Sequence, residues 1–544
     1  MPYQDRSARG MTSLVDNAGE AIMQTVLLLV LVVVPGFLGA LFVGMLFSAD
    51  ADEATTSGLL MTALPFSLVG FVIWFRQSPL WGRFFFDPHD SHGSARFATI
   101  DETTTLSGQD GLLIGQHHPK GHFLRYDGKA HLMTLAPTRT GKGVGTIIPN
   151  LLKVKRPVIV IDPKGENAQI TGAVRAGMGP LHVLDPFGIS GHPSAAFNPL
   201  ADLDPDSPDL GEDAAALADA LVVDPPDQVQ DAHWNEEAKA FITGLILWCV
   251  CHEPEERQTL GTLRELLTLP SDKYAALLVD MQDSDRAGEL IARAANRQIG
   301  KAEREAASVL SNAQRHTHFL DSPRMVTVTG KSDFRFTDLR TQTASVFIVL
   351  PPDRLDVYAR WLRLVVSQAL QDIVRAAQAA PEGVTGQNAA QIPPTLFLLD
   401  EFASLGRLTA VERAMGLMAG YGVQLWPILQ DLSQLKTLYG QSANTFMANS
   451  GVIQSFGVND YETAKWLSLT IGQETRKFHT KDGKGQKTEG LHARDLLTPD
   501  EIMLLDPSLQ ILKVQGMSPL IAKKIVYYQD ERFKWRGDDL LGVI

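Results

Sequence analysis

The stretch "HLMTLAPTRTGKGVGTIIPNLL", residues 131–152, decides the fold expected of this chain. Its first six residues form an apolar run typical of a buried strand, and its last part has the apolar spacing of a helix. A glycine-containing loop joins the two. In this geometry backbone N–H groups and a helix N-terminus can hold phosphate oxygens. The stretch therefore predicts a phosphate-binding loop in an α/β protein.

The loop departs from the usual pattern, which is G-x-x-x-x-G-K followed by Ser or Thr. Ala136 stands where the first Gly is expected, and Gly143 stands where a hydroxyl would reach magnesium. Only Gly141 and Lys142 match, and a Gly-Lys pair alone is common by chance. The strand and helix around the loop strengthen the prediction, and we expect Lys142 to carry positive charge to the outer phosphates.

A second apolar run, "PTLFLLDE" (394–401), ends in two acids. A strand end beside a phosphate loop is where a metal-binding carboxylate is needed, which predicts that role for Asp400. The next acid, Glu401, could polarise an attacking water. Two acids at a strand end also occur in ordinary solvated turns, but their pairing with the loop favours a nucleotide site.

Further apolar, β-branched runs at 156–162, 344–351 and 422–430 are typical of buried parallel strands. Helical patterns alternate with them, for example at 356–378. This alternation predicts a doubly wound parallel sheet.

Residues 206–320 differ in composition, because they are rich in Ala, Leu, Glu and Arg and poor in β-branched runs. They predict an all-helical insert. The expected organisation is a nucleotide-binding domain in two parts (78–205 and 326–515), interrupted by an all-α insert (206–325), preceded by an anchor (1–77) and followed by a short C-terminal tail (516–544).

The first 77 residues contain two uncharged apolar runs, 21–49 and 58–75. At about 1.5 Å per residue, each is long enough to cross a hydrocarbon core of about 30 Å. Arg6 precedes the pair and Arg76 follows it, whereas the connecting residues carry only acids. The positive-inside rule predicts a two-pass protein of the bacterial inner membrane with both termini in the cytoplasm. A cleaved signal peptide is the alternative, which the second run disfavours.

Charge and cysteine content limit the kinds of partner and the cellular compartment to expect. The net charge is −13, from 62 acids against 49 Lys and Arg. A protein that simply coats nucleic acid is usually basic, so contact with DNA would need local patches or a ring of subunits. One such patch is 474–490, which has five Lys or Arg and is either a DNA contact or a solvated hairpin. The two cysteines form no disulfide framework, as expected in a reducing compartment.

Seven segments, in order along the chain, carry a family resemblance. They are "TLAPTRTGKGVGTIIPNLL", "VIVIDPKGEN", "FNPL", "LFLLDEFASLG", "GYGVQLWPILQDLSQL", "SFGVNDYETAKWLS" and "ARDLLTPDEI". Together they resemble the type IV secretion coupling proteins, the TraG-like family, from the N-terminal spans to about residue 515. The resemblance implies an α/β fold: a RecA-like P-loop ATPase domain with an inserted all-α domain and an N-terminal two-helix transmembrane anchor.

The resemblance also implies ATP and Mg²⁺ as cofactors. Family loops commonly read Gly-Lys-Gly and tolerate Ala for the first Gly. Without a hydroxyl at 143, magnesium is expected on Asp400 through water, or with help from a loop threonine. The loop residues implied to bind the nucleotide are Pro137, Thr138, Arg139, Thr140, Gly141, Lys142 and Gly143.

Other functional positions of the family match this sequence one residue at a time. Gln430 matches the γ-phosphate sensor and would join Lys142 and Glu401 in catalysis, although it could also cap a helix. The element "DPKGE" lies beside the nucleotide in the family, or is a structural turn, and it supplies Asp162, Lys164 and Glu166. Some relatives place a trans-acting arginine before the "GYG" turn. This chain has Ala419 there, so that arginine is unassigned.

The function implied is an inner-membrane ATPase that recruits relaxase-bound single-stranded DNA, effector proteins or both to a type IV secretion channel, with hydrolysis driving transfer. Its partners would be the channel proteins and their other ATPases, the relaxase–DNA complex or secreted effectors, single-stranded DNA, the membrane and further copies of the chain in a hexamer. Two alternatives stay open: a nucleotide-switched receptor without motor activity, and an FtsK-type DNA translocase. The sequence does not decide between DNA and protein cargo.

Overall fold

The computed structural model describes residues 92–222, 232–379, 392–417, 420–481 and 487–534. The chain divides into two compact units. One comprises Gly93–Glu474 and Ala493–Ile544 and contains the large sheet. The other comprises Met1–His92 and Thr475–His492. Its described part belongs to the hairpin of β10 (Gln473–Lys481) and β11 (Lys487–Asp495), which carries the predicted basic patch.

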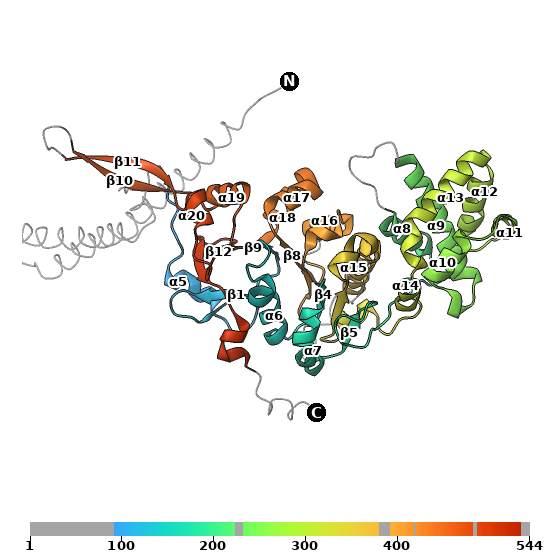
Figure 1. The fold of residues 1–544 in the computed structure, drawn as a ribbon, viewed down its shortest axis with the longest axis horizontal. Helices are drawn as coiled ribbons and strands as arrows, with labels where there is room; N and C mark the ends of the chain where they lie inside the picture. Colours follow the sequence, from blue (N-terminus) through green and yellow to red (C-terminus); the bar gives the residue numbers. More distant parts are fainter. Residues whose placement is uncertain (1–91, 223–231, 380–391, 418–419, 482–486, 535–544) are drawn as a thin grey trace, which may run out of the picture. The chain divides into compact units, whose positions relative to one another are not determined.

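An eleven-stranded sheet forms the centre of the larger unit (Figure 1). Seven adjacent strands run parallel, in the spatial order β9 (Ser450–Ser455), β3 (His131–Leu135), β8 (Val423–Leu429), β7 (Thr395–Leu399), β4 (Val158–Asp162), β6 (Ser345–Val349) and β5 (Leu181–Leu184). Four antiparallel strands extend the sheet beyond β9: β12 (Leu509–Val514), β13 (Leu520–Lys523), β1 (Leu112–His117) and β2 (Phe123–Tyr126). The structure is thus mixed α/β with a large parallel sheet.

The parallel strands are apolar on both faces because both faces are covered. Along β4, Ile159 and Ile161 belong to one hydrophobic core, whereas Val158 and Val160 belong to a second. Side chains alternate between the faces of a strand, so the two cores lie on opposite faces of the sheet. The helices of this part are α5 (Ile100–Thr103), α6 (Ile148–Lys153), α7 (Glu166–Met178), α15 (Leu355–Gln378), α16 (Thr409–Leu417), α17 (Leu432–Tyr439), α18 (Ala443–Ala448), α19 (Tyr461–Ile471) and α20 (Pro499–Met503).

Between β5 and β6 the α-helices of the structure follow one another without a described strand. They are α8 (Leu210–Leu221), α9 (Ala232–His252), α10 (Leu260–Leu267), α11 (Ser271–Gln282), α12 (Leu290–Ile299), α13 (Glu303–Thr317) and α14 (Pro323–Val328), drawn mostly in green in Figure 1. Leu245 and Met281 of this run share a hydrophobic core with Met133 of β3. The helices therefore pack as part of the same compact unit as the sheet, and the domain boundaries drawn from the sequence stay a prediction.

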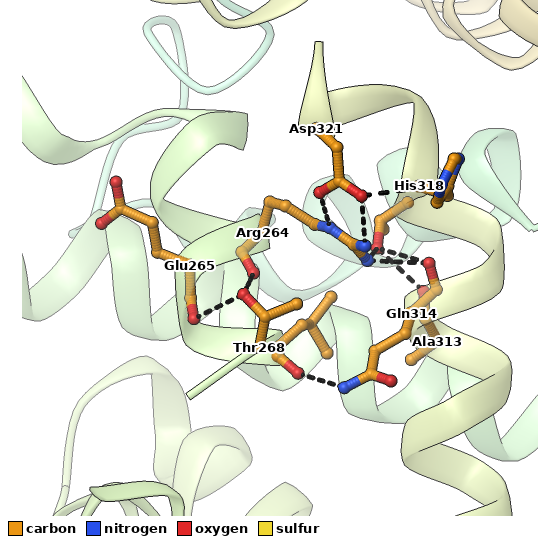
Figure 2. A network of polar contacts seen from close by, with 9 residues as sticks. Arg264, Glu265, Thr268, Ala313, Gln314, His318 and Asp321 are labelled. Carbon is orange, nitrogen blue, oxygen red and sulfur yellow. Dashed lines mark hydrogen bonds and ion pairs between the residues drawn. The ribbon is translucent and has the colours of Figure 1, made fainter. Parts of the chain in front are cut away.

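A polar network fastens two of these helices together (Figure 2). Arg264 of α10 donates two hydrogen bonds to the carboxylate of Asp321, at 2.6 and 2.8 Å, and another to the backbone oxygen of Gln314 in α13, at 2.8 Å. Gln314 in turn donates to the carbonyl of Leu267 at 2.7 Å. Paired Arg–carboxylate hydrogen bonds fix geometry as well as adding energy, so this network sets the position of α10 against α13.

The five predicted parallel strands and the helix at 356–378 are confirmed as β3, β4, β6, β7, β8 and α15. The sequence analysis did not predict β5 or β9. It also did not predict the four antiparallel strands. The β9 segment "SGVIQS" includes the buried polar residues Gln454 and Ser455.

The predicted localisation, a two-pass position in the bacterial inner membrane, is corrected by the helices of the structure. Within the described ranges, none combines the length and the apolar character needed to cross a bilayer. Of the two longest, α9 carries charged residues in its first half and α15 carries them along its length. The two apolar runs at 21–49 and 58–75 fall among residues 1–91, outside the described residues.

Candidate functional site

The candidate site lies where three neighbouring parallel strands end. β8 lies between β3 and β7, with Leu135 opposite Leu429 and Leu399 opposite Pro427. Parallel strands present their carboxyl ends at one edge of a sheet, where ligands of open α/β proteins bind. The glycine loop follows β3, Asp400 follows β7, and Gln430 follows β8 directly. The fold therefore brings the predicted site residues to one edge.

The loop after β3 turns back through backbone conformations that few residues adopt. Arg139 has φ 64° and Gly141 has φ 96°, and the Thr140 hydroxyl donates to the carbonyl of Pro137 at 2.6 Å. Positive φ is costly for a residue with a side chain, so the turn at Arg139 is held by its surroundings. The chain then enters a π-helical turn, Gly143–Ile147, which leads into α6.

Three of the predicted residues form one hydrogen-bonded chain. The Lys142 ammonium group lies 3.1 Å from Oε1 of Glu401. The Gln430 side-chain amide donates to Oε2 of the same carboxylate at 3.0 Å. Lys142 is buried, with 9% of its side chain exposed, whereas 30% of Glu401 is exposed. Glu401 thus joins the glycine loop to the end of β8 through its two carboxylate oxygens.

The backbone of Glu401 is also held in an unusual conformation, with φ 47°. Its N–H donates to Oδ1 of Asp400 at 3.0 Å. Its carbonyl accepts from both the N–H and the hydroxyl of Ser404, at 2.8 and 2.7 Å. Non-glycine residues with positive φ gather at functional sites, where the surrounding structure over-determines them. These contacts aim the Glu401 side chain at Lys142 and Gln430.

Two carboxyl groups at this edge have raised pKa values. Desolvation by the surrounding protein raises the pKa of Asp400 to about 6; nearby Lys142 opposes the rise, and the negative charges of Glu401 and Asp162 add to it. Desolvation also raises the pKa of Asp162 to about 6. A carboxyl group in such an environment gains a partner when a cation binds next to it.

Asp400 fits a magnesium site of the kind found with nucleotides. Mg²⁺ usually takes one or two carboxylates and completes its shell with phosphate oxygens and water. In the described part of the chain, no group of three or more His, Cys, Asp or Glu side chains is arranged to hold a metal ion. The half-buried carboxylate of Asp400 beside the loop therefore suits a cation shared with phosphate.

The "DPKGE" turn has a structural role at its first residue. Asp162 ends β4, and its carboxylate accepts hydrogen bonds from the side chain of Asn167 at 3.2 Å and from the N–H of Ala168 at 2.9 Å. These bonds hold the first turn of α7. Lys164 and Glu166 are exposed on the same turn. Since β4 neighbours β7, the turn lies next to the strand that carries Asp400.

The geometry around Gln430 separates its two interpretations. The helix that follows, α17, is capped by Asp431, whose carboxylate accepts from the N–H of Gln434 at 2.8 Å. The amide of Gln430 is directed instead at Glu401. The Gln430 side chain therefore binds the Glu401 carboxylate, and Asp431 caps α17.

One contact of the loop was not predicted from the sequence. Lys524, which follows β13, donates from its ammonium group to the carbonyl of Thr140 at 2.8 Å. The two residues are 384 positions apart, and no motif in the sequence links them. The described residues of the predicted basic patch lie on β10 and β11, where Arg476 and Lys477 are exposed, and the role of the patch stays a prediction. Ala419 lies outside the described residues.

The chain is similar to known proteins over most of its length. The family model of type IV secretory system conjugative DNA transfer proteins matches residues 95–540. The conjugal transfer protein TraG of Escherichia coli is 30% identical over 452 residues, which cover 77% of this chain and 70% of TraG. The protein VirD4 of Agrobacterium fabrum strain C58 is 28% identical over 468 residues, covering 82% of this chain and 68% of VirD4.

Solved structures of the bacterial conjugative coupling protein TrwB share the fold. The unbound form of TrwBΔN70 superposes with a TM-score of 0.59 at 16% identity, covering 79% of this chain and 92% of that one. TrwB in complex with the ATP analogue ADPNP gives a TM-score of 0.59 at 15% identity, covering 81% of this chain and 95% of that one. Because the family model spans most of the chain and TraG matches over most of its length, the chain belongs to the conjugative DNA transfer family of type IV secretion, the coupling proteins.

Proposed function

We propose that this coupling protein binds ATP with Mg²⁺ at the edge formed by β3, β8 and β7, and hydrolyses it to drive DNA through a type IV secretion channel. The observation that carries the proposal is the chain from Lys142 through Glu401 to Gln430. A cation, a carboxylate and an amide on three adjacent strand ends are the groups that phosphoryl transfer needs for charge, water and γ-phosphate contact.

In the proposed site the N–H groups of loop residues 138–143 surround the phosphates, while Pro137, which has no N–H group, shapes the start of the loop. The Lys142 ammonium group binds the outer phosphate oxygens, and Asp400 holds magnesium directly or through water. The cation, when bound, neutralises charge on the β- and γ-phosphates. Lys164 and Glu166, exposed on the neighbouring turn, lie within the proposed nucleotide surroundings.

The two hydrogen bonds of Glu401 suggest the order of events. Phosphate oxygens replace Oε1 of Glu401 as the partner of Lys142. Gln430 keeps its bond to Oε2 and so holds the carboxylate in place while its other oxygen becomes available to a water molecule. Glu401 then accepts a proton from that water as it attacks the γ-phosphorus, and the bond from this phosphorus to the β–γ bridging oxygen breaks, which gives ADP and inorganic phosphate. Gln430, still on Glu401, transmits the change to β8.

The relatives support both the ligand and the cargo of this proposal. TrwB has been solved in complex with ADPNP and in complex with ADP and Mg²⁺. The matched family is described as acting in conjugative DNA transfer. We propose single-stranded DNA, delivered with its relaxase, as the cargo, and an oligomeric ring of this chain as the active form.

ATP hydrolysis by the full-length chain tests the proposal. The rate is measured against protein concentration, with Mg²⁺, and with or without single-stranded DNA. We expect a cooperative rise with concentration, stimulation by DNA and loss of activity in Glu401→Gln. Tight ATP binding without hydrolysis under every condition would contradict the motor and favour a nucleotide-switched receptor. Stimulation by double-stranded DNA alone would favour a duplex translocase.

A further inference from the structure

Lys524 connects the last strands of the sheet to the glycine loop. It follows β13, and its backbone N–H is held by the carbonyl of Ser508 at 2.8 Å. Its ammonium group reaches the loop and donates to the carbonyl of Thr140 at 2.8 Å. The residue that binds the loop is therefore anchored in the antiparallel part of the sheet, well away along the chain from the strand that carries the loop.

The surroundings of Lys524 make this contact specific. Its ammonium group lies 4.9 Å from the centroid of the Phe456 ring, and the side chain is half-buried. Burial lowers the pKa of Lys524, and the nearby Asp506 carboxylate opposes that shift. The aromatic face and the carbonyl acceptor together restrict the positions that the ammonium group can take.

Close packing encloses the loop at two further points. Gly457, with φ 62°, approaches Thr140 so closely that a Cβ at this position would lie 2.5 Å from the threonine Cγ2. A Cβ on Gly145, in the turn after the loop, would lie 2.9 Å from the carbonyl oxygen of Ile525. The segments 456–457 and 524–525 thus flank the loop and its first helical turn, and a Cβ at Gly457 or Gly145 would be closer to its neighbour than real Cβ atoms come.

Peptide geometry relates the Lys524 contact to the orientation of the next N–H group in the loop. The C=O of Thr140 and the N–H of Gly141 belong to one planar trans peptide unit and point in opposite directions. We propose that Lys524 is a positioning residue for phosphate binding: by holding the Thr140 carbonyl, it directs the Gly141 N–H into the loop. This inference rests on the proposed nucleotide site.

The loop of this chain has particular need of such a contact. Glycines at 141, 143 and 145 give the backbone more freedom than side-chain-bearing residues would, and that freedom is lost when the loop closes on phosphate. An interaction that already fixes one peptide plane in the free protein reduces this loss, as preorganisation does in binding sites generally.

The test compares variants that separate the ammonium donor from the side-chain stem. Lys524→Met keeps the apolar stem over Phe456 but removes the donor, and Lys524→Arg keeps a donor. Lys523→Met, at the neighbouring exposed lysine, is the matched control for the change of charge. The full-length chain is titrated with a fluorescent ATP analogue and Mg²⁺, and its hydrolysis and thermal unfolding are followed alongside.

We expect Lys524→Met to raise the Kd and the KM for ATP about five- to tenfold, as for loss of a charged hydrogen bond. The kcat should stay within about twofold, because Lys142, Glu401 and Gln430 are unchanged. Lys524→Arg should recover most of the affinity, and Lys523→Met should match wild type.

Two outcomes overturn the inference: a Kd for Lys524→Met within twofold of wild type, or equal losses in the Met and Arg variants. A fall in kcat and unfolding temperature without a change in KM also contradicts it, because it indicates a purely structural role. If the wild-type protein itself fails to bind the nucleotide, the proposed function fails. This outcome differs from failure of the Lys524 inference, in which wild type binds the nucleotide and the Lys524 variants bind it equally well.

Discussion

Replacing Glu401 by Gln is expected to tighten ATP binding while removing hydrolysis. In the structure the carboxylate of Glu401 lies 3.1 Å from the ammonium group of Lys142, and so occupies the cation that incoming phosphate requires. Gln430 can still donate to the amide oxygen that replaces Oε2. The substitution therefore removes a competing charge and leaves the neighbouring contact in place.

The size of the effect follows from the geometry. At 3.1 Å and an effective dielectric constant of about 20, the gross attraction between the two charges is about 5 kcal/mol. Because 30% of the Glu401 side chain is exposed, and because desolvation opposes pairing, the net contribution is about 1–2 kcal/mol. Since about 1.4 kcal/mol corresponds to a factor of ten, we expect ATP to bind about tenfold more tightly. Loss of the proton acceptor should slow hydrolysis by about 10²–10⁴.

Equilibrium titration with a fluorescent ATP analogue, together with phosphate release, measures both quantities. Glu462→Gln, at an exposed position in the first turn of α19, is the matched control and should behave as wild type. Weaker or unchanged ATP binding by Glu401→Gln would refute the argument that Glu401 competes with phosphate for Lys142. Hydrolysis close to the wild-type rate would refute its role as the proton acceptor.

Three further predictions follow from other contacts. Lys142→Ala should weaken ATP binding at least about 100-fold and abolish conjugative transfer in a mating assay, because it removes the ammonium group that the loop offers to the outer phosphates. Binding of the Mg²⁺ nucleotide should decline as pH falls from 7 to 5, because Asp400, with a pKa of about 6, must lose its proton to hold the cation; Asp400→Asn should flatten this profile. Arg264→Ala should lower the free energy of unfolding by about 2 kcal/mol in urea denaturation, since it removes the paired bonds to Asp321.

Each of these has an outcome that contradicts it. Normal transfer by Lys142→Ala would exclude a motor that depends on the loop, and the same pH profile in wild type and Asp400→Asn would exclude Asp400 as the titrating ligand. For Arg264, the wild-type advantage should shrink in acid. The pKa of Asp321 is lowered by its bonds to Arg264, so this stability is present above the unfolded pKa of about 4 and is lost as pH falls below it. An advantage as large in acid as at pH 7 would contradict the assignment, because only the bonds of Arg264 to Gln314 and Thr317 should then remain.

The parallel strands could be predicted because burial on two faces leaves an almost continuous apolar run, as in β4 and β7. β9 could not, because it contains Gln454, a buried polar residue. Its side chain accepts hydrogen bonds from Thr134 and Thr146, more than 300 residues away in the sequence. A polar residue satisfied only by distant partners looks like a surface residue until the fold is known.

The same reasoning explains what was found of the site. Lys142 and Glu401 could be predicted because each follows an apolar run, and parallel strand ends meet at one edge. Gln430 was predicted from the family resemblance. Their hydrogen-bonded connection through the two oxygens of Glu401 required the structure. Lys524 gave no signal, since its partner is a backbone carbonyl, which every residue has.

The order of strands in the sheet has a consequence for synthesis of the chain. β3 pairs only with β8 and β9, whereas the helical run from α8 to α14 is translated in between. β8 begins about 290 residues after β3 ends, which at about 5–20 residues per second leaves β3 unpaired for roughly 15–60 s. The helices, whose contacts are mostly local, can form while the apolar strand waits for its neighbours on the ribosome. A nascent chain stopped before Val423 would carry the complete glycine loop on a strand with no partner, exposed to chaperones and proteases.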